Sequence, residues 1–163
     1  MHKTTLTFIV LIILTFIVAV SCGKSSSQGS VSCTTIDPTA DSSALLSFAR
    51  TNGMTPVKDT TGLYYQIITQ GTGATLNGNS RIFVTYTGTL LNGTIFDSTT
   101  NAAKTGFQLG TLIAGWQIGL PKIQAGGHIK LLIPSAYGYG CLGSGTIPPN
   151  SPIYFDVTLV SVQ

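Results

Sequence analysis

Alternation of apolar and polar residues predicts β-strands across most of the chain beyond residue 62. In residues 81–90, Ile82, Val84 and Tyr86 face one way and the residues between them face the other. Asn92-Gly93 follows, which is typical of a tight hairpin turn. Further strands are predicted over residues 63–69, 94–97, 107–109, 128–133 and 153–162.

Two short segments follow a helical period instead. In residues 113–120, Ile113, Trp116 and Leu120 share one face, and Pro121 is expected to end or kink the helix. Residues 41–51 carry Leu45, Phe48 and Ala49 on one side and predict a helix lying on the domain or on the tether before it. Many antiparallel strands and one central helix predict an α+β fold, with a twisted sheet of five or six strands half-wrapped around that helix.

The start of the chain has the pattern of an export signal. His2 and Lys3 precede an apolar run, residues 6–20, which is signal-length but short for a membrane span of ~20 residues. The small residues before Cys22 resemble a bacterial lipobox, which implies cleavage before Cys22 and a lipid on its sulfur; an ordinary signal peptide with an incidental cysteine is the alternative. Gly23, rather than Asp, favours the outer membrane in a diderm host. We therefore expect a signal peptide over 1–21, a flexible tether over 22–39, a short helical extension over 40–61 and one domain over 62–163.

Composition excludes several function classes. The chain has eight Lys and Arg and five acidic residues, all Asp, and the basic residues are scattered, so a nucleic-acid surface is not expected. Its two histidines, His2 and His128, suit neither a Ser-His-Asp triad nor a zinc site, and His128 reads as a surface residue. No metal or cofactor is expected. In an exported protein Cys33 and Cys141 form either a disulfide or two free thiols, and the sequence leaves both open.

Several short motifs resemble the FKBP-type peptidyl-prolyl isomerases over about residues 62–163. They are the segments 84–88 (VTYTG), 92–93 (NG), 96–98 (FDS), 115–116 (GW), 136–140 (AYGYG) and 147–149 (IPP), which occur in the family's order. The resemblance implies the same half-wrapped sheet with a proline-binding pocket between sheet and helix. It also implies a cis–trans isomerase of X–Pro bonds that needs no covalent intermediate.

Site residues follow from the resemblance position by position. Asp97, Tyr139 and Tyr86 are the implied catalytic residues, with Tyr139 hydroxyl as a donor and Asp97 hydrogen-bonded to Tyr86. Ile113 is expected to donate its backbone N–H to a substrate carbonyl, and Trp116 to form the pocket floor. The remaining implied substrate contacts are Phe96, Phe107, Leu112, Ile147 and Phe155.

The chain departs from the family at Thr105, where an aromatic residue often completes the pocket wall. We expect this change to weaken binding of bulky macrolide inhibitors. The implied partners are proline-containing unfolded or exported polypeptides. The protein is expected to be a monomer that its lipid anchors at the cell envelope. A module that binds proline-containing chains, or acts like a chaperone, with little turnover is the main alternative, and a structural lipoprotein with a vestigial pocket is another.

Overall fold

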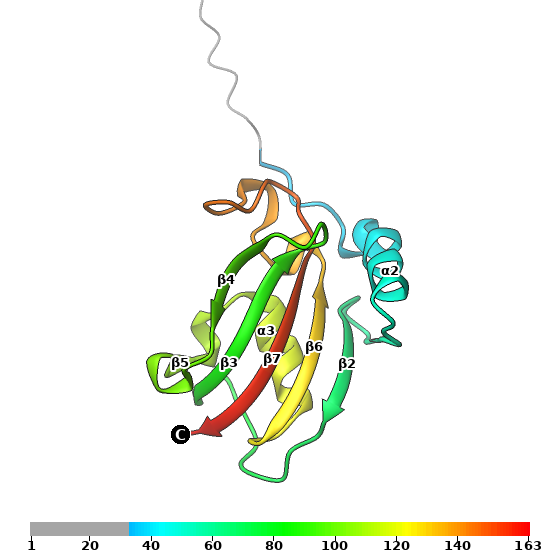
Figure 1. Ribbon diagram of the computed structural model, residues 1–163. Coiled ribbons are helices and arrows are strands. Elements are labelled where there is room, and N and C mark those ends of the chain that lie inside the picture. Colours follow the sequence, from blue (N-terminus) through cyan, green and yellow to red (C-terminus); the bar gives the residue numbers. More distant parts are fainter. Residues whose placement is uncertain (1–32) are drawn as a thin grey trace, which may run out of the picture. The chain divides into compact units, whose positions relative to one another are not determined.

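The computed structural model describes residues 33–163, where strands are the most abundant regular elements. They form one antiparallel sheet in the order β1-β2-β6-β7-β3-β4, with β5 paired to the first two residues of β3 (Figure 1). A two-residue strand such as β1 shows no alternation, so the sequence pattern did not predict it. The strands are β1 (Val57–Lys58), β2 (Tyr64–Thr69), β3 (Arg81–Leu90), β4 (Ile95–Thr99), β5 (Phe107–Gln108), β6 (Gly127–Ile133) and β7 (Ile153–Val162).

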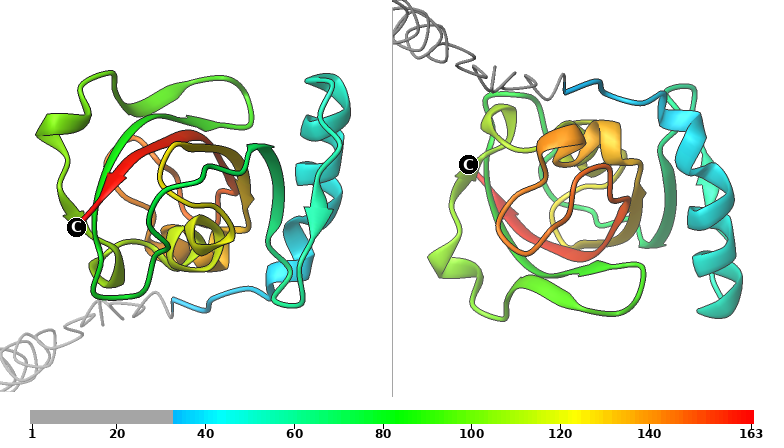
Figure 2. Two further views of the ribbon diagram at one scale, coloured as in Figure 1. Left: turned by 90° about the horizontal axis from the view of Figure 1, so that it is seen from below. Right: turned by 90° about the horizontal axis from the view of Figure 1, so that it is seen from above.

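The inner face of the sheet packs against the short helix α3 (Ala114–Gly119). Seen end-on in Figure 2, the curved sheet passes around α3. Close approach is possible because α3 carries glycines: a Cβ at Gly115 would lie 2.5 Å from Ile133 Cγ2. Pro121 lies in a 3₁₀ turn directly after the helix, so the predicted stop is observed. The predicted fold class, an antiparallel sheet around one short central helix, is confirmed.

A second helix, α2 (Ser42–Thr51), covers part of the outer face of the sheet. Leu45 and Ala49 are buried there, and the Phe48 ring lies 5.2 Å from the Tyr154 ring. This contact explains the run Leu131-Leu132-Ile133 in β6, in which all three residues are fully buried. Strand alternation turns Leu132 outward, and α2 shields it from water.

A disulfide joins Cys33 to Cys141, with 5.4 Å between the two Cα atoms. Of the two alternatives that the sequence left open, the structure therefore has the bridge. It ties the start of the described chain to the loop between β6 and β7. The bond closes a sequence separation of 108 residues.

The sequence predicts His128 as a surface residue, and in the structure its side chain is partly exposed and has an acidic partner. Its Nε2 lies 2.5 Å from Asp156 Oδ1, and the side chain is only 30% exposed. Asp156 also accepts a hydrogen bond from the Tyr154 hydroxyl at 3.1 Å. The sequence could not show this pairing because β6 and β7 are separated by a long loop and meet only in the sheet.

The expected signal segment 1–21, the lipid attachment at Cys22 and most of the tether lie outside the described residues. Within residues 33–163, no helix combines the length and hydrophobicity that crossing a membrane requires.

Candidate active site

Three strands carry aromatic rings to one end of the inner face. Tyr86 comes from β3, Phe96 from β4 and Phe155 from β7. Tyr86 and Phe155 lie on the inner face because the strand period places them in line with Val84 and Val157, which are fully buried. Together the rings form a wall that is built from segments far apart in the chain.

Gly88 allows this wall to close. A Cβ at this position would lie 2.5 Å from Phe155 Cε1 and 2.7 Å from Phe96 Cε2, inside the contact distance of carbon atoms. The two rings therefore meet edge-to-face directly over the backbone of β3, with centroids 5.4 Å apart and planes at 85°. Any side chain at residue 88 would separate them.

Helix α3 supplies the floor beneath the rings. Trp116 is 3% exposed and makes edge contacts with two wall residues. Its ring centroid lies 5.1 Å from that of Phe155, at 83° between planes, and 5.3 Å from that of Tyr86, at 87°. Perpendicular rings on two sides hold the indole flat under the opening.

The floor and the wall enclose a pocket of about 400 Å³, including its mouth. Its lining is mostly aromatic and aliphatic, with few polar atoms. The lining residues are Tyr86, Asp97, Phe107, Leu112, Ile113, Trp116, Tyr139 and Phe155. A small apolar group fits such a pocket, and a charged one would lose its hydration there.

One carboxylate lies at the pocket edge and is already engaged. Asp97 Oδ2 accepts a hydrogen bond from the Tyr86 hydroxyl at 2.6 Å. Partial burial raises the pKa of Tyr86 well above its ordinary value, and this hydrogen bond to Asp97 raises it further. Tyr86 is therefore a neutral donor, and its hydroxyl fixes the position of the carboxylate.

Three donors on the lining residues have no partner among the described atoms. Tyr139 lines the pocket, and burial followed by the nearby charge of Asp97 raises its pKa, so the phenol keeps its proton at neutral pH. The backbone N–H of Ile113 has no acceptor within residues 33–163, although the Ile113 carbonyl accepts from Trp116 N. Trp116 Nε1 is buried and likewise has no partner among the described atoms.

Most of the implied site residues are brought together in this pocket, and two lie elsewhere. Phe96 supports the wall from behind, packed on Phe155 and on Tyr139, with centroids 5.4 and 6.3 Å apart, and is not in the lining. Ile147 was expected to line the flap, but it is only 5% exposed and packs into the main core. Its backbone pairs with Ser144 across the loop, which turns the side chain inward.

Thr105 is not among the residues that line the pocket. Its hydroxyl accepts from Val84 N at 3.0 Å and donates to Ala102 O at 2.7 Å. The side chain is therefore used to hold the turn before β5 and does not reach the lining. Phe107, two residues later, supplies the aromatic surface at this side, with its centroid 6.5 Å from that of Tyr86.

Several residues that hold this site could not be predicted from the sequence. Asp41 and Ser135, 94 positions apart, are joined by hydrogen bonds at the start of the loop that carries Tyr139. An isolated Asp at a helix start reads as an ordinary cap, and nothing in the sequence pairs it with a distant serine. In the part of the chain that the structure describes, no three His, Cys, Asp or Glu side chains gather as a set of metal ligands.

Comparison with known proteins agrees with this geometry. A family model described as FKBP-type peptidyl-prolyl cis-trans isomerase matches residues 73–160. The chain is 40% identical over 117 residues to an Escherichia coli protein named FKBP-type peptidyl-prolyl cis-trans isomerase FkpA, an alignment that covers 71% of this chain and 43% of that protein. It is 42% identical over 107 residues to a Schizosaccharomyces pombe peptidyl-prolyl cis-trans isomerase, covering 63% of this chain and 96% of the relative.

The fold is also similar to solved structures. The crystal structure of Escherichia coli FkpA superposes with a TM-score of 0.66 at 36% identity, covering 78% of this chain and 59% of that one. The alignment spans less than half the length of the FkpA relative, so the longer protein has parts that this match does not include. With more than half of its residues matched by the family model and the pocket in place, the chain belongs to the FKBP-type peptidyl-prolyl cis-trans isomerase family.

Proposed function

We propose that the protein is a peptidyl-prolyl cis–trans isomerase that assists the folding of exported proteins at the cell envelope. The observation that carries this proposal is a largely apolar, aromatic pocket with unengaged donors among its lining residues, in a chain of this family. The pocket suits the ring of proline, which is apolar and uncharged. The donors suit the carbonyl groups on either side of it.

The chemistry follows from the amide bond. Rotation about X–Pro meets a barrier of ~18–20 kcal/mol because the twisted state loses resonance, and uncatalysed exchange takes tens of seconds or longer. The planar amide has more charge separation than the twisted one. Transfer from water into an aromatic pocket therefore costs the planar form more free energy than it costs the twisted form. No bond to carbon is made or broken. A pocket that binds the twisted geometry more tightly than the planar one is therefore sufficient for catalysis.

Specific residues would hold the substrate in that geometry. Trp116 would lie under the proline ring, and the Ile113 N–H and Tyr139 hydroxyl would bind flanking carbonyl oxygens. Asp97, already fixed by Tyr86, would act as an oriented charge at the rim and not as a proton acceptor. Each of these interactions favours rotation only to the extent that it is stronger in the twisted state.

The test is the rate of cis–trans exchange of a short X–Pro peptide with purified full-length protein, followed by NMR exchange spectroscopy. We expect clear acceleration over buffer. Tyr139→Phe removes one hydrogen bond worth about 0.5–1.5 kcal/mol and should lower kcat/KM by about two- to tenfold. Tyr154→Phe is the matched control, because it removes a hydroxyl that bonds Asp156 on the opposite face of the sheet.

A binding module without turnover is distinguished in the same samples. Trp116 is the single tryptophan of the chain and forms the pocket floor, so its fluorescence reports whether a proline peptide enters. A fluorescence change with exchange no faster than in buffer would reject the enzyme and support the binding module. Asp97→Ala should also lower turnover, whereas Trp116→Ala would mix loss of the site with about 3–5 kcal/mol of core damage.

The envelope location rests on the first residues and on relatives. One similar protein, 42% identical over 105 residues, is named Outer membrane protein MIP in Legionella longbeachae. We propose a lipid on Cys22 that tethers the domain to the outer membrane of a diderm host, with proline-containing exported chains as substrates. Mass spectrometry of the N-terminal peptide from isolated membranes tests this, and a soluble chain without lipid would contradict it.

A further inference from the structure

Tyr139 lies in a loop whose other residues are tied to the N-terminal part of the chain. We call residues 134–152, between β6 and β7, the Tyr139 loop. It begins with a 3₁₀ turn, Ser135–Tyr137, and continues into a second turn, Gly140–Leu142, which Tyr139 precedes. Neither turn has a side-chain cap, so local hydrogen bonds alone hold these turns weakly.

The first tie is a buried carboxylate. Asp41 Oδ2 accepts from both the backbone N–H and the hydroxyl of Ser135, each at 2.7 Å. Ser135 is fully buried and Asp41 is 8% exposed. Asp41 stands at the N-terminus of α2, where the helix dipole favours negative charge, yet its side chain makes no capping hydrogen bond to that helix. Its hydrogen bonds are therefore directed at the Tyr139 loop.

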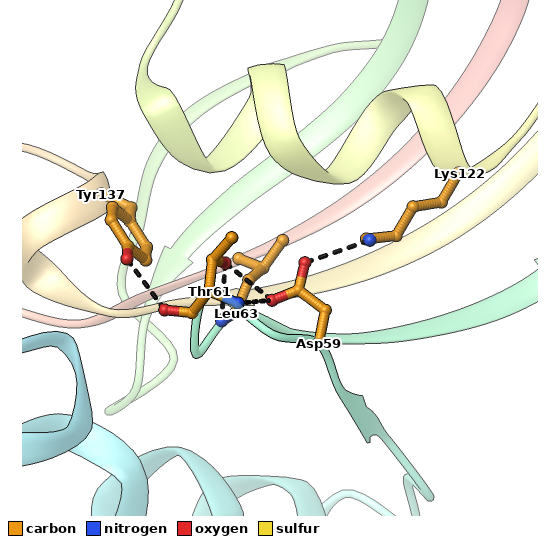
Figure 3. A network of polar contacts seen from close by, with 5 residues as sticks. All are labelled: Asp59, Thr61, Leu63, Lys122 and Tyr137. Atoms are coloured by element: carbon orange, nitrogen blue, oxygen red, sulfur yellow. Dashed lines mark hydrogen bonds and ion pairs between the residues drawn. The ribbon is translucent and has the colours of Figure 1, made fainter.

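The second tie holds the other end of the same turn. Tyr137 is two residues before Tyr139, and its hydroxyl donates to Thr61 O at 2.8 Å (Figure 3). Thr61 is itself held by Asp59, which accepts from its N–H at 2.8 Å and from its hydroxyl at 2.6 Å. Asp59 pairs with Lys122 at 3.0 Å, which follows α3, so the turn is connected to the segment that carries the pocket floor.

The third tie follows Tyr139. Cys141 is bonded to Cys33, so Tyr139 lies between attachments at residues 135, 137 and 141. Asp41, Thr61 and Cys33 all precede residue 73, where the match to the family model begins. The segment before the matched domain thus forms part of the support of its proposed site.

We propose that Asp41 is a positioning residue for Tyr139, acting through Ser135 to hold the first turn of the Tyr139 loop. The proposal rests on the isomerase function above. Without the carboxylate, two buried polar groups of Ser135 would lack a partner, and the turn would shift until they found one. A shift of the turn would move the Tyr139 hydroxyl away from its acceptor, so the most it can cost is the contribution of that hydrogen bond, about two- to tenfold in kcat/KM.

The kinetic test is a double-mutant cycle between Asp41→Ala and Tyr139→Phe in the full-length protein. If Asp41 acts through Tyr139, Asp41→Ala lowers kcat/KM by no more than Tyr139→Phe does, about two- to tenfold, and has no further effect in the Tyr139→Phe background. A role in general stability would lower the rate by the same factor in both backgrounds, and that result would overturn the proposal.

Asp37→Ala is the matched control. It also removes an aspartate from the N-terminal segment, but this carboxylate bonds only Thr39 and is exposed. We expect its kcat/KM to equal that of the unmodified protein. Asp41→Asn keeps an acceptor oxygen of the same shape and should recover part of the rate, and it replaces Asp41→Ala if the alanine variant does not fold.

A second measurement is independent of turnover. Amide hydrogen exchange by NMR should show Ser135 and its neighbours up to residue 140 exchanging faster in Asp41→Ala than in Asp37→Ala, with the amides of β3 and β7 unchanged. If the protein does not accelerate cis–trans isomerisation of the peptide, the proposed function fails. The amide hydrogen exchange still decides whether Asp41 holds the turn at Ser135. Equal exchange at Ser135 in the two variants would overturn the positioning proposal.

Discussion

Individual residues of the pocket are tuned to remain neutral donors. The Tyr86 hydroxyl is bonded to Asp97, and Tyr139 stands free beside the same carboxylate. Burial first, and then the negative charge, raises the pKa of both phenols. The only histidine of the described chain, His128, lies on the other face of the sheet, so no imidazole lines the pocket.

This arrangement predicts a flat pH profile. A phenol ordinarily loses its proton near pH 10, and a raised pKa moves that loss to higher pH. We therefore expect kcat/KM for an X–Pro peptide to stay constant between about pH 6 and about pH 9. The measurement is the exchange rate across that range at constant ionic strength.

Tyr139→Phe provides the control for the profile. Its rate should be lower but equally flat over the same range. A loss of activity between those limits that is present in the unmodified protein and absent in Tyr139→Phe would show that Tyr139 titrates there, contrary to the effect of burial and of Asp97.

At the scale of elements, an ion pair between Asp59 and Lys122 joins the segment before β2 to the turn that follows α3. Partial burial opposes ionisation of Asp59, but hydrogen bonds from Thr61 and the pair with Lys122 outweigh it, so the pKa of Asp59 lies below its usual value. A lowered folded-state pKa stabilises the protein above the unfolded-state pKa, and this contribution is lost as pH falls through the folded value.

We predict that Asp59→Asn destabilises the protein by about 1 kcal/mol at neutral pH and by less near pH 3, where Asp59 is protonated in the unfolded chain. Urea unfolding of both proteins at the two pH values measures the difference. Lys122→Gln should reproduce the neutral-pH loss. An equal difference at both pH values would show that the charge of Asp59 contributes nothing.

Patterns within single elements were read correctly from the sequence. The predicted strand over 81–90 coincides with β3, and the helix over 113–120 contains α3. Both follow from side-chain periods that any local window displays. The two-residue strand β1 is too short to display a period. The covering of Leu132 by α2 depends on a contact between elements far apart in the chain, about which a local period has no information.

At the scale of the molecule, the disulfide joins the N-terminal segment to the Tyr139 loop across most of the described chain. A cross-link of this span restricts the unfolded chain and typically stabilises the fold by about 2–4 kcal/mol. We predict that Cys33→Ser lowers the free energy of unfolding by that amount, measured as a lower denaturant midpoint, without changing the strand order of the sheet.

Cys141→Ser and the double variant should unfold at the same midpoint as Cys33→Ser, because each removes the same bond. Reductant should bring the unmodified protein to that midpoint and leave the variants unchanged. A midpoint of the reduced protein equal to that of the oxidised one would show that the bond does not stabilise the fold.

Local pattern and family motifs were enough to predict the strands, the central helix and most of the pocket lining. Each of these depends on residue periods or on motifs of a few neighbouring positions, which the chain displays directly. The inward turn of Ile147, the pairing of His128 with Asp156 and the choice of a disulfide for Cys33 and Cys141 came only with the folded chain. The same holds for the bond between Asp41 and Ser135. These features join residues that lie far apart or face a particular neighbour, and folding alone brings such atoms within the few ångströms over which hydrogen bonds, packing and disulfides act.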